Sequence, residues 1–169
     1  IDKTDEELKE LRALKINELN IGIESGMDEV MQHLNKGFTL DEARTQLLRL
    51  KKAGIEFSIN IILGAAGMEK SLENAIANSK FINETEPYLI FVATMHVDPG
   101  SQLREELEAG TFVENTLGQN LTEEIEMLRR IEARYTYFYG LHTSNVIPVH
   151  GLVGDKKEEM LQTLEDGME

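Results

Sequence analysis

The amino-acid sequence predicts an α/β fold, in which parallel strands alternate with helices around one core. Apolar, strand-like runs alternate with amphipathic helical segments through the first 110 residues. Two of these runs, residues 19–26 and 57–67, each end in a turn of small residues before the next helix. With 169 residues, 41% of them hydrophobic, and only 3 prolines, the chain is long enough for one substantial core. Because parallel strands joined by helices bring their carboxyl ends to one edge, we expect a ligand site there.

Capping residues and apolar periodicity predict the elements in the first two-thirds of the chain. Thr4 precedes three acidic residues, and Leu8 and Leu11 recur on one face, which indicates a capped amphipathic helix. Apolar residues alternate at 19, 21 and 23, which indicates a strand. The next expected elements are a short helix at 28–35, a helix from the cap Thr39 to Gly54, a strand at 55–63, a helix at 70–83, a strand at 88–95 and a helix at 101–109.

The last third of the chain is predicted to be mainly helical. We expect a long helix from Thr122 to Tyr139, a loop from Gly140 to Gly154, and a final helix over residues 155–164. Three strands make a thin, open sheet, and the outer edge of its first strand is exposed. An exposed apolar edge predicts either further strands on the N-terminal side or self-association of the chain through that edge.

Composition and charge exclude several classes of protein. A net charge of −14 argues against a nucleic-acid partner, because such binding relies on clustered Lys and Arg. The absence of cysteine excludes disulfides, thiolate-bound zinc and an iron–sulfur cluster held by these residues. No apolar run approaches the roughly 20 residues that cross a bilayer, and the N-terminus has no signal-peptide core, so we expect a cytoplasmic protein without a membrane partner. The chain does not begin with Met, which predicts an excised piece of a longer polypeptide.

Four short motifs follow one another in register along the first half of the chain. They are Ile21-Gly22-Ile23-Glu24-Ser25-Gly26, Leu34-Asn35-Lys36-Gly37, Ala53-Gly54-Ile55 and Asn60-Ile61-Ile62-Leu63-Gly64. Their order and spacing resemble the second half of a radical SAM core, in the branch that includes oxygen-independent coproporphyrinogen III oxidase and related Fe–S oxidoreductases. The resemblance extends from about residue 2 to residue 107. It implies three parallel βα units of a partial TIM-like barrel over residues 1–110 and a helical C-terminal extension over residues 111–169.

The resemblance also implies a cofactor chemistry. In that family a [4Fe–4S] cluster is bound by a Cys-x-x-x-Cys-x-x-Cys loop, and S-adenosylmethionine (SAM) binds the open iron of the cluster. One electron from the cluster cleaves SAM to a 5′-deoxyadenosyl radical, which abstracts hydrogen from a small-molecule substrate. Since this chain has no cysteine, the cluster loop is expected to precede it in a parent protein; a natural homologue without cysteines is the alternative. The chain alone is then an inactive, SAM-holding part of an enzyme.

The same resemblance gives roles to particular residues. Glu24 corresponds to the polar residue at the end of the fourth barrel strand that contacts the cofactor, and Lys36 to a basic residue that pairs with the methionyl carboxylate. Asn60 falls on the fifth-strand position that addresses the ribose hydroxyls. The further expected cofactor contacts are Ser25, Ile62, Gly64 and Gly67. His96, near the carboxyl end of the third strand of this chain, is the candidate catalytic proton donor, and no residue is expected to bind a metal.

Each of these residues also has a simpler structural explanation. Glu24 and Ser25 can cap the next helix, and Lys36 can complement the dipole at a helix C-terminus. His96 can be a polar residue that merely ends a strand. Asn60 is harder to explain in this way, because a buried amide needs hydrogen-bond partners and an aliphatic residue would be the simpler choice within an apolar strand.

Three other features have ordinary explanations. The acidic stretches 105–108 and 123–126 are expected to be solvated helix faces. His142 and His150 are eight residues apart, which matches no metal-ligand spacing, so we expect them to anchor the loop between them. The aromatic residues at 135–139 either stack on a flat substrate or pack in the core.

Two functions of other classes stay open at the level of the sequence. The turn from Gly64 to Gly67 and the following helix N-terminus suit an anion, which would make the chain a phosphate-binding or nucleotide-binding α/β module. The acidic helices suit a non-catalytic interaction domain that docks a basic partner, with binding that weakens as salt is added.

Overall fold

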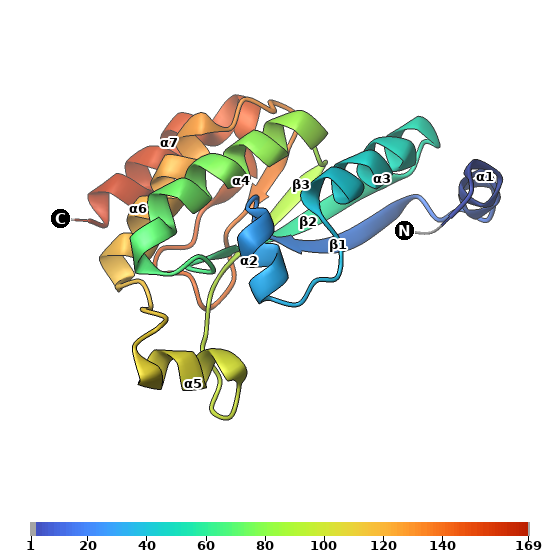
Figure 1. Ribbon diagram of the computed structural model, residues 1–169. Coiled ribbons are helices and arrows are strands. Elements are labelled where there is room, and N and C mark those ends of the chain that lie inside the picture. The colour runs from blue at the N-terminus through green and yellow to red at the C-terminus, as the bar shows by residue number, and fades with distance from the viewer. Residues whose placement is uncertain (1–2, 169) are drawn as a thin grey trace.

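A computed structural model describes residues 3–168 and contains one five-stranded sheet, which lies behind its helices in Figure 1. The strands are β1 (Glu18–Glu24), β2 (Glu56–Leu63), β3 (Leu89–Thr94), β4 (Tyr137–Tyr139) and β5 (His150–Leu152), and they lie side by side in that order. The first four strands are parallel, and β5 is antiparallel to β4. The predicted α/β class with a mostly parallel sheet is therefore confirmed.

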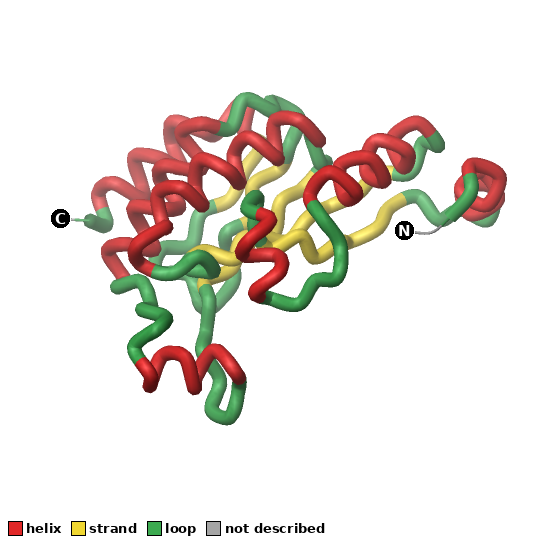
Figure 2. The backbone as a smooth tube through the Cα atoms, viewed as in Figure 1, coloured by secondary structure: helices red, strands yellow, loops and turns green. Residues whose placement is uncertain are grey.

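Helices cover one face of this sheet and leave the other face without helices. The helices are α1 (Asp5–Ala13), α2 (Asp28–His33), α3 (Leu40–Lys52), α4 (Ser71–Thr85), α5 (Gln102–Ala109), α6 (Leu117–Arg130) and α7 (Val153–Asp166), with a 3-10 turn, η1 (Met68–Lys70), before α4. Figures 1 and 2 show α3, α4, α6 and α7 in a row on the covered face, whereas α5 lies apart from the main body. No helix among residues 3–168 is long and apolar enough to cross a membrane.

Capping hydrogen bonds explain where the predicted helices begin. Thr4 and Thr39 each accept a hydrogen bond from the backbone N–H three residues later, and a glutamate at that position bonds back to the threonine N–H. These are the two starts that the sequence predicted. Thr116 forms a third such box with Gln119 and starts α6, which moves the beginning of that helix five residues ahead of the expected Thr122.

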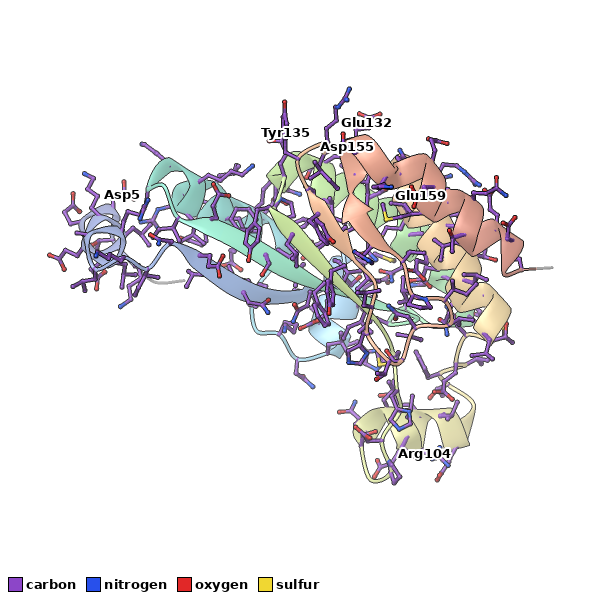
Figure 3. The ribbon with its side chains drawn as sticks, turned by 180° about the vertical axis from the view of Figure 1, so that it is seen from behind. Asp5, Arg104, Glu132, Tyr135, Asp155 and Glu159 are labelled. Carbon is purple, nitrogen blue, oxygen red and sulfur yellow. The ribbon has the colours of Figure 1, made fainter. Side chains whose placement is uncertain are left out.

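The alternation of side chains along β2 separates a core face from a second face. Phe57, Ile59 and Ile61 are fully buried and belong to the core beneath the helices, and Lys51 of α3 lies over the Phe57 ring. The intervening side chains of β2 point the other way. We call the opposite side of the sheet, which carries Asn60, Ile62, Phe91 and Tyr139, the helix-free face; Figure 3 views the molecule from that side.

The sequence-based expectation for the last third of the chain was partly wrong. The helix predicted to continue to Tyr139 ends at Arg130, and Tyr137–Tyr139 forms β4 instead. The predicted loop 140–154 contains β5, and α7 begins at Val153. Aromatic residues favour strands, and β4 gains hydrogen bonds along the edge of β3, where the Tyr137 N–H donates to the Tyr88 carbonyl over 2.8 Å. Residues 111–169 thus add two strands to the same sheet, while a domain division at residue 110 stays a prediction.

One edge of the sheet is unpaired in the described part of the chain. Among residues 3–168, β1 pairs with β2 alone, through the register Glu18 to Glu56 up to Gly22 to Asn60. This agrees with the exposed edge expected from the sequence. Whether further strands or a second copy of the chain complete that edge stays a prediction.

Gly26 marks the closest approach between the turn after β1 and α4, and replacing it tests the fold. A Cβ on Gly26 would overlap the backbone of Ala77 and lie 2.6 Å from the Asn78 nitrogen. We predict that Gly26→Ala lowers the free energy of unfolding by about 3 kcal/mol or more, as overpacking against backbone does. Urea titration followed by circular dichroism measures this.

The matched control is Gly118→Ala on α6. A Cβ there meets no atom within 4 Å, so helix propensity should make this variant more stable by about 0.5 to 1 kcal/mol. Equal unfolding midpoints for the two variants would contradict the close packing of the turn against α4.

Candidate cofactor site at the strand ends

Glu24, the last residue of β1, has an unusual backbone conformation. This conformation places its carboxylate next to Gly22, two residues earlier on the same strand. Its φ is 71°, in the left-handed region that non-glycine residues rarely adopt, and the register with β2 slips between Gly22 and Glu24. A Cβ at Gly22 would overlap Glu24 Oε1, so any larger residue there would displace the carboxylate from this position. Strained residues and bulges of this kind cluster at functional sites, which makes the end of β1 a candidate.

Lys36 completes an ion pair at the same point. Its ammonium donates to Glu24 Oε1 over 3.0 Å, and the two side chains are only 22% and 16% exposed. Asn35 and Gly37 on either side have φ of 54° and 72°, which bends the chain back toward β1 after α2. A Cβ at Gly22 would lie 3.1 Å from Lys36 Nζ, so the pair sits over Gly22. The structure therefore brings together two residues that the sequence singled out separately.

Asn60 lies beside this ion pair on β2. Its cross-strand partner on β1 is Gly22, the residue under the pair, and its partner on β3 is Phe91. Asn60 Oδ1 is buried and has no hydrogen-bond partner among the described residues. A buried polar atom without a partner is rare in proteins, and a bound ligand is one of its explanations. Glu24, Lys36 and Asn60 thus form one polar cluster on the helix-free face.

The other predicted site residues are placed differently. Ile62 is half-buried, two residues beyond Asn60 on the helix-free face, and pairs in register with Ala93 of β3. His96 lies beyond the end of β3 with a side chain that is 79% exposed, and its Nε2 is 3.6 Å from an Asp98 oxygen. The structure gives His96 no contact with the polar cluster, so its catalytic role stays a prediction.

Ser25, Gly64 and Gly67 are tied into the protein itself. The buried Ser25 hydroxyl donates to Asn74 Oδ1 over 2.6 Å and accepts from the Met27 N–H, so its only donor is already used within the protein. Gly64 and Gly67 have φ of 79° and 75° and form the turn after β2. Cofactor contacts by these three residues stay predictions, while the structure shows that they shape the turns on either side of the strand ends.

A buried carboxylate that the sequence did not single out organises this edge of the sheet. Glu123 of α6 is 1% exposed and accepts hydrogen bonds from Ser71 Oγ (2.6 Å) and Asn74 Nδ2 (2.8 Å). It also accepts from Asn115 Nδ2 (2.8 Å) and from the Gly64 N–H, which is 3.2 Å from each of its oxygens. Burial raises the pKa of Glu123, and these donors oppose that rise.

The expectation that residues 123–126 form a solvated helix face was therefore wrong for Glu123 and Glu124, both of which are buried. Four neighbours satisfy Glu123, so it is an internal structural carboxylate. The same arrangement bears on the anion-site alternative. The Gly64 N–H and the Ser71 hydroxyl, which a phosphate at this turn would use, already donate to Glu123. These two donors are therefore not free to bind a phosphate. A cavity of about 260 Å³ borders the turn at residues 65–70, so an anion site there stays a prediction.

The described residues contain no candidate metal centre. Within residues 3–168, no three His, Cys, Asp or Glu side chains gather in a way that could hold a metal ion. With no cysteine in the sequence, a [4Fe–4S] cluster does not fit the residues of this chain. SAM fits better, because the polar cluster offers a cation, a carboxylate and an amide with an unpartnered atom.

The fold is an open, mostly parallel α/β sheet that is consistent with part of a TIM-like barrel. No family model and no curated protein match the chain. Among solved structures, it is similar to Elp3 of the archaeon Methanocaldococcus infernus, in a form lacking N-terminal residues 1–46, with a TM-score of 0.69 and 17% sequence identity. The match covers 98% of this chain and 40% of the Elp3 chain, so this chain spans less than half the length of that protein.

Glu124 supports a prediction about stability and pH. It is 1% exposed, its Oε1 has no hydrogen-bond partner among the described residues, and burial raises its pKa from 4.5 to about 8. A carboxyl group whose pKa is higher in the folded state costs nothing below pH 4.5 and progressively destabilises the fold as the pH rises to 8. We predict that Glu124→Gln is more stable than the wild type at pH 9 by about 3 to 5 kcal/mol and that this advantage shrinks toward zero at pH 4.

Urea unfolding of both proteins between pH 4 and pH 9 measures this difference. The exposed Glu158 on α7 provides a matched Glu→Gln control, for which no comparable pH-dependent gain is expected. An E124Q advantage that does not change with pH would show that Glu124 is not a neutral buried acid.

Proposed function

We propose that this chain is the SAM-holding part of a radical SAM oxidoreductase, with the cofactor bound on the helix-free face at the ends of β1 and β2. The observation that carries the proposal is the unpartnered Asn60 amide beside the Glu24–Lys36 pair over Gly22. Two further findings support it. Four motifs resemble a radical SAM core, and the fold resembles that of Elp3, a member of the radical SAM superfamily.

Each residue of the polar cluster has a binding role that its chemistry allows. Lys36 has three N–H donors and gives one to Glu24, so its ammonium can also pair with the carboxylate of the methionyl group. Asn60 supplies an amide that can hydrogen-bond the ribose hydroxyls. Glu24 holds the ammonium over Gly22 and keeps its charge compensated before the ligand enters.

We assign the [4Fe–4S] cluster and its ligands to a longer parent protein. When bound to a [4Fe–4S] cluster, SAM supplies a 5′-deoxyadenosyl radical, and the ligands of that cluster lie outside this chain, which has no cysteine. The 40% coverage of Elp3 supports a longer parent. The chain alone should hold the cofactor without turning over a small-molecule substrate.

Titrations with SAM and with adenosine separate the two binding roles. Adenosine has the ribose and the adenine of SAM but no carboxylate. We predict that Lys36→Met weakens SAM binding about 5-fold to 10-fold and leaves adenosine binding unchanged, because only SAM offers an anion to the ammonium. Asn60→Leu should weaken the binding of SAM and of adenosine by similar factors, because both ligands carry the ribose. Chemical-shift titration of the isotope-labelled chain measures all four affinities.

Lys52→Met is the matched control, because Lys52 is exposed at the end of α3, on the helix side of the sheet. It should leave both affinities at the wild-type value. Loss of SAM affinity in K52M equal to that in K36M would point to a general charge effect. Equal losses of SAM and adenosine in K36M, or none in either, would contradict the assigned role of Lys36.

A further inference from the structure

A single transverse row of side chains crosses all five strands on the helix-free face. Gly22 pairs in register with Asn60, Asn60 with Phe91, Phe91 with Tyr139, and Tyr139 with His150. Directly opposed residues of neighbouring strands point to the same face of a sheet. The row therefore runs from the ion pair over Gly22, through the unpartnered amide, to two aromatic rings and a histidine.

The aromatic part of the row is a stacked pair of rings, which we call the platform and which leaves only its outer ring faces available for further stacking. The rings of Phe91 and Tyr139 stack with centroids 5.1 Å apart and an angle of 21° between their planes. The imidazole of His142 meets Phe91 edge-on, with centroids 5.8 Å apart and an angle of 71°. Phe91 and Tyr139 are half-buried and lie on the side of the sheet that carries no helix, which is the side seen in Figure 3. Rings that only pack in the hydrophobic core would lie on the helix-covered face of the sheet, as the fully buried Phe138 does.

The exposed His142 contacts Ser144 through Nδ1. The Ser144 N–H donates to His142 Nδ1 over 3.2 Å, and Ser144 Oγ lies 2.7 Å from the same nitrogen. An Nδ1 that accepts from this N–H places the proton of the neutral ring on Nε2, and this is the tautomer that we assign. The segment that carries His142 is anchored on β3, because Ser144 Oγ accepts from the Thr94 N–H and Asn145 Nδ2 donates to the Val92 carbonyl. In this tautomer His142 presents an N–H donor beside Phe91. The contacts that anchor the loop belong to Ser144 and Asn145, so the anchoring role expected for His142 itself stays a prediction.

We propose that Phe91, Tyr139 and His142 form the substrate platform, and that the substrate carries a planar ring with a carbonyl-type acceptor on its edge. The ring stacks beside Phe91 and Tyr139, and its acceptor receives the hydrogen bond from His142 Nε2. This assignment rests on the proposed function in one respect: the ring is taken as the substrate that lies next to SAM. Asn60, between the platform and the ion pair, marks the boundary between the two ligands.

Two small probes that differ only in ring character test the platform on the wild-type chain. They are 2-pyridone, a planar aromatic lactam, and 2-piperidone, its saturated counterpart with the same amide edge. We predict that 2-pyridone binds at least 5-fold more tightly in chemical-shift titrations, because only a planar ring stacks. Equal affinities for the two probes would overturn the proposal without the need for any variant.

Variants then assign the preference to particular side chains. Tyr139→Leu should remove the preference for the planar probe. Phe91→Leu should also remove it, and it serves as the test if Tyr139→Leu does not fold. His142→Phe should weaken the binding of 2-pyridone about 3-fold to 10-fold, because phenylalanine lacks the Nε2 donor. This variant should keep the preference for the planar probe, because phenylalanine still provides a ring. Tyr135→Leu is the control, because Tyr135 is 90% exposed and its side chain points outward at the top of Figure 3. An unchanged preference in Y139L would overturn the proposal.

The SAM titrations distinguish failure of the platform from failure of the cofactor assignment. If SAM does not bind but 2-pyridone does so with the predicted dependence on Tyr139, the platform stands and the cofactor assignment fails. If SAM binds as predicted but the two lactams bind equally, the platform assignment fails and the proposed function stands.

Discussion

The buried carboxylate of Glu123 is the interaction on which the ligand edge of this fold depends. It joins the end of β2, the start of α4 and the segment before α6 through four donors. Asn74, one of these donors, also accepts from Ser25 and so links the turn after β1 to the same centre. Burying a carboxylate is costly unless hydrogen bonds replace its water, and here both oxygens are satisfied. The positions of Glu24 and Asn60 follow from the strand ends that this network holds.

The two faces of the sheet have different roles: one packs the hydrophobic core, and the other carries the candidate ligand-binding residues. On the helix side, alternating Phe57, Ile59 and Ile61 bury apolar surface against α3, α4 and α6, and this packing supplies most of the stabilisation. On the helix-free side, the same strands present an ion pair, an amide and stacked rings. Because successive residues of a strand point to opposite faces, one short sequence serves both tasks. The strained Glu24 backbone is tolerable because the packed face fixes both ends of β1 and β2.

Much of the fold could be predicted from the sequence, because local signals determine it. The threonine caps at Thr4 and Thr39 and the apolar runs of β1, β2 and β3 each act within a few residues. Strand β4 was missed because a three-residue strand carries little periodicity, and its pairing with β3 lies far along the chain.

The sequence singled out three residues that the structure brings together, but it did not predict their geometry. The motifs pointed to Glu24, Lys36 and Asn60, yet the bulge that turns Glu24 over Gly22 and toward Lys36 has no signature in the sequence. Glu123 and Glu124 were missed for a related reason. Acidic residues on a helix normally face water, and only tertiary packing shows that these two are buried.

The central claim is that this chain holds SAM for a cluster bound elsewhere in a longer polypeptide. The most direct measurement is the iron content and visible absorption of the polypeptide encoded by the complete gene, purified without oxygen. The account predicts a Cys-x-x-x-Cys-x-x-Cys loop upstream of this sequence, about four irons per chain and a broad charge-transfer absorption that SAM perturbs. A complete gene product without that loop and without iron would contradict it.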